Sequence, residues 1–128
     1  MFIHKEVNLP NVKTVTMNRK RFYETPEGNK YPSITTVLSN RKKEGLWEWR
    51  KRVGEDVANY VARTSAARGT SIHHMCEDYL NNMQTDFPEE FAKHENKFLH
   101  YCLFKQLRDQ ALKNIDSIYA QETGLYSD

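Results

Sequence analysis

A histidine and a glutamate stand four residues apart in the middle of the chain, at His73 and Glu77. On an α-helix, residues at i and i+4 share one face, so the imidazole and the carboxylate can point at the same spot. Together these side chains can hold a divalent cation or position a water molecule. The same spacing is also common on solvated helix faces, where it gives only weak stabilisation. A metal-ligating pair and an ordinary helix surface are therefore both open, and His74 should point to a different face.

The residues before this pair predict the start of a helix over 70–81. Gly69 punctuates the chain, and Thr70 or Ser71 is a suitable N-cap. Arg68 would then place a fixed cation beside a helix N-terminus, where phosphate groups are favoured. Metal ligands next to a phosphate-binding corner indicate metal-assisted phosphodiester chemistry.

Charge is distributed unevenly along the chain, although its net value is only +2. Residues 1–52 contain 12 Lys and Arg against 5 Asp and Glu, whereas residues 53–128 contain 7 against 12. The cations of the basic half form three clusters with aromatic residues among them, including Trp47 and Arg50. Cations follow phosphates and flat rings stack on bases, so this half is a candidate surface for single-stranded nucleic acid. The alternative is a solvated basic face with its aromatic rings in the core, and we expect one of the rings of Trp47 and Trp49 to be buried.

The first forty residues predict a hairpin and a short helix. Residues 11–24 alternate loosely and are expected to form one arm, residues 25–29 the turn, and Lys30-Tyr31 the start of the second arm. Pro32 favours extended backbone at Tyr31, and Ser33 is a good N-cap for a helix that ends at Leu38.

Longer helices are expected after this hairpin. Apolar residues at helical spacing predict a helix over 45–64 with Gly54 in its interior, followed by the helix over 70–81. Pro88 is suited to the first turn of a further helix that ends near Lys113. The apolar stripes of these helices are expected to be core, and they are Trp49, Val53, Val57, Tyr60 and Val61, then Ile72, Met75, Cys76, Tyr79 and Leu80, then Phe91, Phe98, Cys102, Leu103, Leu107 and Leu112.

A strand is expected over 117–123, with Ile118, Ala120 and Glu122 on one face. A single strand leaves its backbone groups unpaired, so it must pair with the hairpin or with residues that this sequence does not contain.

Length and composition fit one domain inside a cell. The 128 residues suffice for one domain of ordinary size, and an apolar content of 38% makes the core lean. The apolar start of the chain is cut short by His4 and Lys5, so we expect no secretory signal, and no apolar run reaches the length of a membrane span. Cys76 and Cys102 are therefore expected to be reduced core thiols in a cytosolic or organelle-matrix protein.

Four motifs stand in order along the chain: Tyr31–Ser39, Leu46–Arg50 with Gly54-Glu55, Ala66–His73 followed by Glu77, and Ile118–Glu122. Their order and spacing resemble the PD-(D/E)xK nuclease superfamily in its RecB-like exonuclease branch, in particular phage exonucleases and the mitochondrial genome maintenance exonuclease. The resemblance covers roughly residues 21–128. The Arg-Gly-Thr-x-x-His run and the Pro-Ser-x-Thr-Thr element are its most specific parts.

The resemblance implies a DNA exonuclease, a hydrolase that uses Mg²⁺ or Mn²⁺ on single-stranded DNA. His73 would help to coordinate the catalytic metal, with Glu122 as a strand carboxylate just before the catalytic core. Arg68 would contact phosphate. Three further residues would line the side where the strand enters: Tyr31, Ser33 and Thr35. A phage origin would place the protein in the host cytoplasm, and no small-molecule cofactor, membrane or particular oligomer is implied.

One departure from the family is serious. Its catalytic Asp and Asp/Glu-x-Lys follow the position of Glu122, and the residues up to Asp128 supply neither. Glu95-Asn96-Lys97 has the spacing but lies within a predicted helix. The chain is therefore expected to be the N-terminal part of one nuclease domain over 1–128, with weak or absent catalysis on its own. Its parts would be the hairpin and strand-entry motif (1–40), a helical region (44–113) and the first core strand (115–123).

The expected fold is α+β, restriction-endonuclease-like but incomplete, with helices on a mixed sheet whose core strands are mostly missing. A second hypothesis is a non-catalytic module that binds single-stranded nucleic acid through the basic half. A third is a metal-binding helical domain that uses His73, Glu77 and either His94 or His100. It is the weakest, because no Cys/His cluster has structural-zinc spacing.

Overall fold

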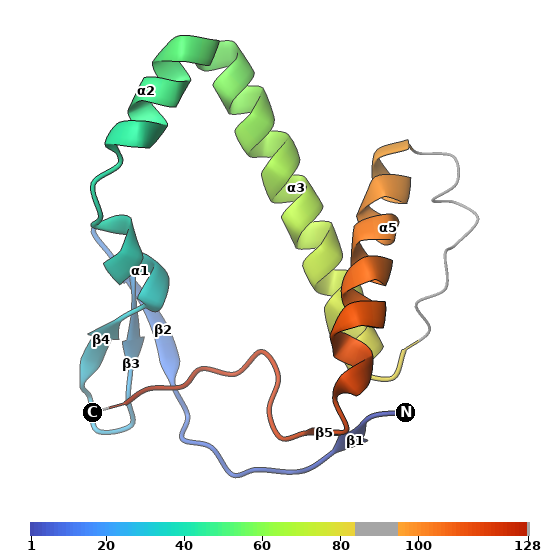
Figure 1. Cartoon of the computed structure of the whole chain (residues 1–128). Helices are drawn as coiled ribbons and strands as arrows, with labels where there is room; N and C mark the ends of the chain where they lie inside the picture. The colour runs from blue at the N-terminus through green and yellow to red at the C-terminus, as the bar shows by residue number, and fades with distance from the viewer. Residues whose placement is uncertain (84–94, 128) are drawn as a thin grey trace.

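The computed structural model describes residues 1–83 and 95–127 and has a mixed α+β architecture (Figure 1). A small sheet with one short helix lies at one side, and two helices, Glu44–Val53 (α2) and Glu55–Leu80 (α3), lead away from it as an inverted V. At the far side, a further helix packs against the second of them. The α+β prediction is confirmed at this level. The elements are β1 (Ile3–His4), β2 (Lys13–Met17), β3 (Lys20–Glu24), β4 (Lys30–Pro32), α1 (Ile34–Ser39), α2 (Glu44–Val53), α3 (Glu55–Leu80), α5 (Glu95–Gln110), the 3₁₀ turn η1 (Leu112–Asn114) and β5 (Ser117–Ile118).

The predicted single arm over 11–24 is wrong, because it contains two strands. β2 and β3 pair antiparallel, and a two-residue turn at Asn18-Arg19 joins them. Both turn residues have positive φ, 50° and 62°, as a type I′ hairpin turn requires. Asn tolerates this conformation but Arg rarely adopts it. Only one of the two turn residues is therefore typical of such a turn, and the sequence did not predict it.

The predicted turn at 25–29 is confirmed, and it joins β3 to β4 in a three-stranded antiparallel sheet. Its ends are held by a hydrogen bond from the Thr25 backbone N–H to the Asn29 carbonyl oxygen at 2.8 Å.

The short helix that Ser33 was expected to cap is also confirmed. The Ser33 hydroxyl accepts from the Thr36 backbone N–H at 3.1 Å and is buried. The Ser33 backbone N–H and the Thr36 hydroxyl both donate to the carbonyl oxygen of Arg21, each at 3.1 Å. These bonds attach the start of α1 directly to β3.

Gly54 does not lie inside a helix but separates α2 from α3. Its φ of 92° and ψ of 152° belong to a region that is essentially restricted to glycine. The Arg50 guanidinium donates to the Asn59 side-chain oxygen across this bend. The periodicity of 45–64 continues on both sides of Gly54, which is why the sequence predicted one helix where there are two.

The predicted helix start at Gly69-Thr70 is wrong as well. α3 runs without interruption from Glu55 to Leu80, so neither Thr70 nor Ser71 is a cap, and Arg68 lies mid-helix. A glycine inside a helix costs only about 1 kcal/mol relative to alanine. The helix formers on both sides, among them the Ala66-Ala67 pair, outweigh that cost.

α5 packs against the C-terminal half of α3 (Figure 1). It ends at Gln110 and is followed by η1, slightly before the predicted end at Lys113. The predicted start at Pro88, with Phe91 and His94, lies outside the described residues.

The buried centre of the molecule is small. Phe104 of α5 is fully buried, and its ring meets Tyr79 of α3 edge-on at 6.0 Å between centroids. Tyr79 in turn meets Phe2 edge-on at 5.0 Å. Among the described residues, the other buried apolar side chains are Ala58 and Ile118.

Most of the predicted apolar stripes are therefore not core. Val57 and Tyr60 of α3 are 51% and 59% exposed, and Phe98 and Leu107 of α5 are also exposed. The accessible surface of 10,425 Å² compares with about 7,100 Å² for a compact protein of 15.1 kDa. The periodicity that predicted these helices was correct, but few of their faces find a partner within the described chain.

The two cysteines and the two tryptophans are less buried than the sequence predicted. Cys76 and Cys102 are both free thiols, as predicted, but Cys102 is exposed rather than in the core. Neither tryptophan is buried, since Trp47 is 60% exposed and Trp49 is half-buried. In the described part of the chain, no helix has both the length and the apolar character needed to cross a membrane.

Candidate metal centre

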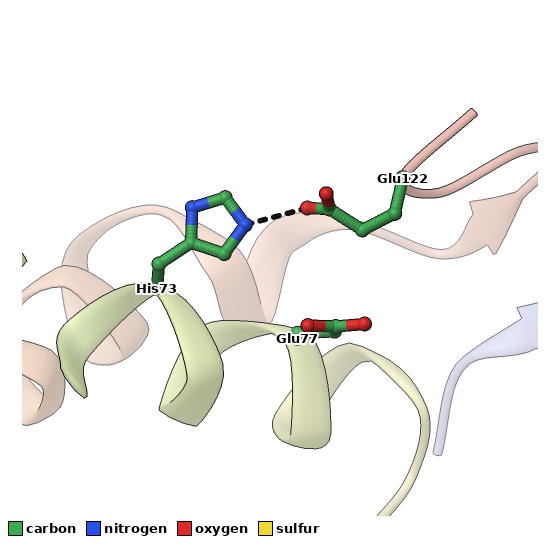
Figure 2. Close-up of side chains that lie close together, drawn as sticks. All are labelled: His73, Glu77 and Glu122. Atoms are coloured by element: carbon green, nitrogen blue, oxygen red, sulfur yellow. Dashed lines mark hydrogen bonds and ion pairs between the residues drawn. The ribbon is translucent and has the colours of Figure 1, made fainter. Parts of the chain in front are cut away.

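The site begins with two side chains on one face of α3. His73 and Glu77 are one helical turn apart, as their spacing predicted, and Glu122 reaches them from the segment that follows β5 (Figure 2). Nε2 of His73 donates to Oε1 of Glu122 at 2.6 Å. One ligand atom from each of the three residues lies within 4.8 Å of the other two. All three were candidates from the sequence, His73 and Glu77 as metal ligands from their spacing and Glu122 as a carboxylate from the resemblance.

The prediction of a strand over 117–123 is wrong, so Glu122 reaches the site from an irregular segment and not from a strand. Only Ser117 and Ile118 form a strand, and it pairs in parallel with β1 rather than with the hairpin. Glu122 has a φ of 54°, in the left-handed region that non-glycine residues seldom occupy. Such a conformation costs roughly 1–3 kcal/mol and persists only where its surroundings enforce it.

Contacts between the N-terminal strand and the end of α3 fix the path that leads to Glu122. The Asn82 side-chain oxygen accepts from the Phe2 backbone N–H at 2.7 Å, and its NH₂ donates to the Phe2 carbonyl oxygen at 2.9 Å. Nε2 of His4 donates to the carbonyl oxygen of Leu80 at 2.7 Å. Because β5 pairs with β1, these bonds hold both strands against the end of the helix that carries His73 and Glu77.

Gln121 completes this attachment next to the site itself. Its side-chain NH₂ donates to the backbone carbonyl oxygen of Glu77 at 3.1 Å. Its own amide oxygen is buried and has no hydrogen-bond partner within the described residues. Gln121 thus joins the two chain segments that supply the three ligands, and nothing in the sequence distinguished it from other polar residues.

The cluster is open to solvent. The side chains of His73 and Glu122 are 61% and 53% exposed, and that of Glu77 is 33% exposed. His74 faces elsewhere but stays close, with its Nδ1 3.7 Å from Oε2 of Glu77. An ion and its waters could therefore approach without opening the fold.

The donor set fits a divalent metal of the first transition row. One imidazole nitrogen and two carboxylate oxygens suit Mn²⁺, and the carboxylates also suit Mg²⁺, which prefers oxygen ligands. Three protein ligands leave further coordination positions for water or a phosphate oxygen. Binding would replace the hydrogen bond between His73 and Glu122, because the imidazole nitrogen must be deprotonated to act as a ligand. His100, an alternative ligand in the helical-domain hypothesis, does not belong to this cluster.

The other predicted site residues lie in separate places. Arg68 is exposed and precedes His73 by five helical positions, which turns it about 140° away from the ligand face. Because it lies mid-helix, the predicted phosphate-binding corner at a helix N-terminus does not exist. Trp47 and Arg50 line a hollow at the bend between α2 and α3. Tyr31, Ser33 and Thr35 line a larger cleft beside the sheet, together with residues 123–127.

Comparison with known proteins found no similar protein. A scan against protein-family models, a search of curated proteins and a search of solved structures each gave no match for this chain.

Proposed function

We propose that this chain belongs to a metal-dependent nuclease that hydrolyses phosphodiester bonds of single-stranded DNA, with exonuclease action and a restriction-endonuclease-like fold. The observation that carries the proposal is the convergence of His73, Glu77 and Glu122 from two segments that lie far apart in the sequence. The mixed α+β character of the chain supports the proposed fold.

His73, Glu77 and Glu122 would hold one Mg²⁺ or Mn²⁺ ion. The ion would supply polarisation of a phosphate oxygen and activation of a bound water. His73 and Glu77 lie one turn apart on α3, and Gln121 attaches the segment of Glu122 to that helix, so the three ligands would need little rearrangement on binding. Among the described residues only one such group of His, Cys, Asp and Glu occurs, so we expect that part of the chain to hold one ion and to support weak hydrolysis.

The basic half of the chain would bind the DNA. Its charge attracts phosphates, and the exposed ring of Trp47 provides a face on which an unpaired base can stack. Binding should weaken steeply as the salt concentration rises, because phosphate contacts release counterions.

The test is Mn²⁺ binding, followed by electron paramagnetic resonance of the free ion. We expect His73→Ala and Glu77→Gln to abolish binding at the cluster. Asp78→Asn is the matched control, because Asp78 neighbours Glu77 on α3 but is not in the cluster. Equal Mn²⁺ affinity of the Glu77→Gln and Asp78→Asn variants would contradict the metal centre.

Cleavage is measured separately, on 5′-labelled single-stranded DNA with Mg²⁺ or Mn²⁺. We expect slow metal-dependent shortening from one end by the chain and none by the His73→Ala variant. Cleavage that persists at the same rate in that variant would show that another site, or a contaminant, is responsible.

A second candidate function is non-catalytic binding of single-stranded nucleic acid. The hollow at the bend favours it, because Trp47, Arg50 and Lys51 meet there, and the Trp47 ring is 60% exposed. Under this function, Trp47→Ala and Arg50→Gln weaken DNA binding, whereas His73→Ala has no effect and DNA is never cut.

A further inference from the structure

A second site lies beside the three-stranded sheet, separate from the three metal-ligand residues. It is an open cleft of about 800 Å³ between the region of β3, β4 and the start of α1 on one side and residues 123–127 on the other. Figure 1 shows the C-terminal segment crossing back to this sheet after it leaves β5.

Three tyrosine side chains line the cleft. Tyr23 and Tyr31 come from adjacent positions on β3 and β4, which pair directly, and Tyr126 comes from the C-terminal segment. The rings of Tyr31 and Tyr126 are nearly parallel, at 16°, with their centroids 6.1 Å apart. A planar aromatic group can extend such a stack, since offset parallel rings attract one another over this range.

The charge of the cleft favours an anion next to that planar group. Among the described residues that line the cleft, Arg21 is the only charged one and none carries a carboxylate. The hydroxyl groups of Thr35, Thr123 and Ser127 add polar edges. The Thr123 hydroxyl donates to the Gln121 carbonyl oxygen, and the Thr35 hydroxyl lies 3.0 Å from that of Ser33, which caps α1. The chemistry that matches flat rings, one guanidinium and neutral polar edges is that of a nucleotide.

The C-terminal wall is held in place by close packing. A Cβ added at Gly124 would lie 3.3 Å from Cβ of Val12, so the backbone at Gly124 approaches the residue just before β2 closely. The Tyr126 hydroxyl donates to a carboxylate oxygen of Glu27 in the turn between β3 and β4, at 3.4 Å. The segment that carries Tyr126 is thereby attached to the sheet on both sides.

The chain places this cleft close to the metal centre. Its C-terminal wall begins at Thr123, the residue after Glu122. Tyr126 lies four positions after Glu122 in the chain, and even a fully extended chain would span at most about 14 Å over that length. A strand whose phosphate lies at the metal centre could therefore place a nearby base in the cleft.

We propose that the cleft binds one unstacked nucleobase of single-stranded DNA on the Tyr31–Tyr126 pair, with Arg21 contacting the attached phosphate. The position of this base relative to the cleaved bond rests on the proposed nuclease function. Base binding itself does not, because it involves none of the metal ligands.

The test compares thymidine 5′-monophosphate with 2-deoxyribose 5-phosphate, which has the same phosphate but no base. Both are titrated into the chain in EDTA, and binding is followed by NMR of the tyrosine ring protons. We expect the nucleotide to bind and to shift the ring signals of Tyr31 and Tyr126, and the sugar phosphate to bind much more weakly. Equal binding of the two compounds, or no binding of the nucleotide, would overturn the proposal.

Variants locate the site. Tyr126→Leu should weaken nucleotide binding roughly 5- to 150-fold, the usual loss for one base–aromatic stack. Tyr126→Phe keeps the ring and should bind like the unaltered chain. Tyr119→Leu is the matched control, because Tyr119 is 59% exposed and lies outside the cleft. An equal loss in the Tyr119→Leu and Tyr126→Leu variants would contradict the assignment to this cleft.

The two proposals fail in different measurements. His73→Ala should leave nucleotide binding in EDTA unchanged while Mn²⁺ binding is lost. Nucleotide binding that depends on Tyr126 in a chain that binds no Mn²⁺ would support the cleft and refute the metal centre. Mn²⁺ binding by the cluster without nucleotide binding would refute the cleft alone.

Discussion

Nε2 of His73 and Oε1 of Glu122 lie 2.6 Å apart, although 49 positions separate the two residues in the chain. Neither side chain is buried, so no core packing forces them together. The contact depends instead on the backbone of Glu122, which adopts a positive φ, and on the neighbouring Gln121. An unfavourable backbone conformation that aims a carboxylate at a histidine is the kind of strain that accumulates at functional sites.

Replacing Gln121 by alanine tests this arrangement. The variant loses the hydrogen bond to the Glu77 carbonyl oxygen but keeps all three ligands. Residues that orient metal ligands typically change affinity 10- to 100-fold, so we expect Mn²⁺ to bind at least about tenfold more weakly. Titration calorimetry measures the change. Gln106→Ala, at an exposed position of α5, is the control. If Gln121→Ala binds Mn²⁺ as tightly as Gln106→Ala does, Gln121 has no positioning role.

Two glycines of the helical region should respond oppositely to alanine. At Gly54 the backbone conformation is essentially restricted to glycine, and Gly54→Ala should lower the free energy of unfolding by about 1–3 kcal/mol. At Gly69, inside α3, alanine is the better helix former and should raise it by about 0.5–1 kcal/mol. Neither added methyl group would meet a neighbouring atom within 4 Å. Backbone conformation therefore decides whether each substitution raises or lowers the free energy of unfolding.

Urea denaturation, monitored by far-ultraviolet circular dichroism, gives both free energies. Gly54→Ala should also increase helical signal, if the strain is relieved by joining α2 to α3. Stabilisation by both substitutions would mean that α2 and α3 already form one helix in solution. That result would contradict the bend at Gly54.

The same two glycines show what local sequence could and could not predict. The Ser33 cap and the extended backbone that Pro32 favours at Tyr31 predicted the start of α1 correctly, because both effects act within a few residues. Gly54 and Gly69 carry the same local signal, yet one ends a helix and the other lies inside one. The difference comes from whether neighbouring residues sustain the helix, which single residues do not encode.

The candidate site was predictable in part for the same reason. His73 and Glu77 follow from helical spacing, which is a local property. Glu122 was named through the resemblance of its motif, but the residues around it form no strand, and a bend at Gln121-Glu122 brings its side chain to α3. The pairing of β5 with β1 links residues near opposite ends of the chain, and no periodicity predicts such a contact.

The two thiols should differ in reactivity. Burial raises the pKa of the Cys76 thiol, so less of it is the reactive thiolate near neutral pH. Cys102 is exposed on α5. We expect iodoacetamide to modify Cys102 first and Cys76 only slowly, as measured by mass spectrometry of the peptides over time. Full denaturation should make the two rates similar. Equal rates in the folded chain would contradict the partial burial of Cys76.

His100 should make the fold sensitive to acid. Burial lowers the pKa of its imidazole below the ordinary value of 6.5, and the nearby positive charge of Arg68 lowers it further. Nδ1 of His100 is buried and has no hydrogen-bond partner within the described chain. The unfolded chain therefore takes up a proton on this ring more readily than the folded chain does. Stability is unaffected well above pH 6.5 and falls as the pH drops through 6.5 toward the lowered value.

Comparison of variants isolates this contribution from the other histidines. His100→Gln removes the titrating ring, so its urea midpoint should decline less than that of the unaltered chain when the pH is lowered through this window. Arg68→Gln removes only the neighbouring charge and should reduce the acid sensitivity in part, because burial is the larger cause. His74→Gln serves as the control, since the His74 side chain is 70% exposed. If the three variants and the unaltered chain lose stability in parallel, protonation of His100 is not linked to folding, and the ring must reach solvent in the folded chain.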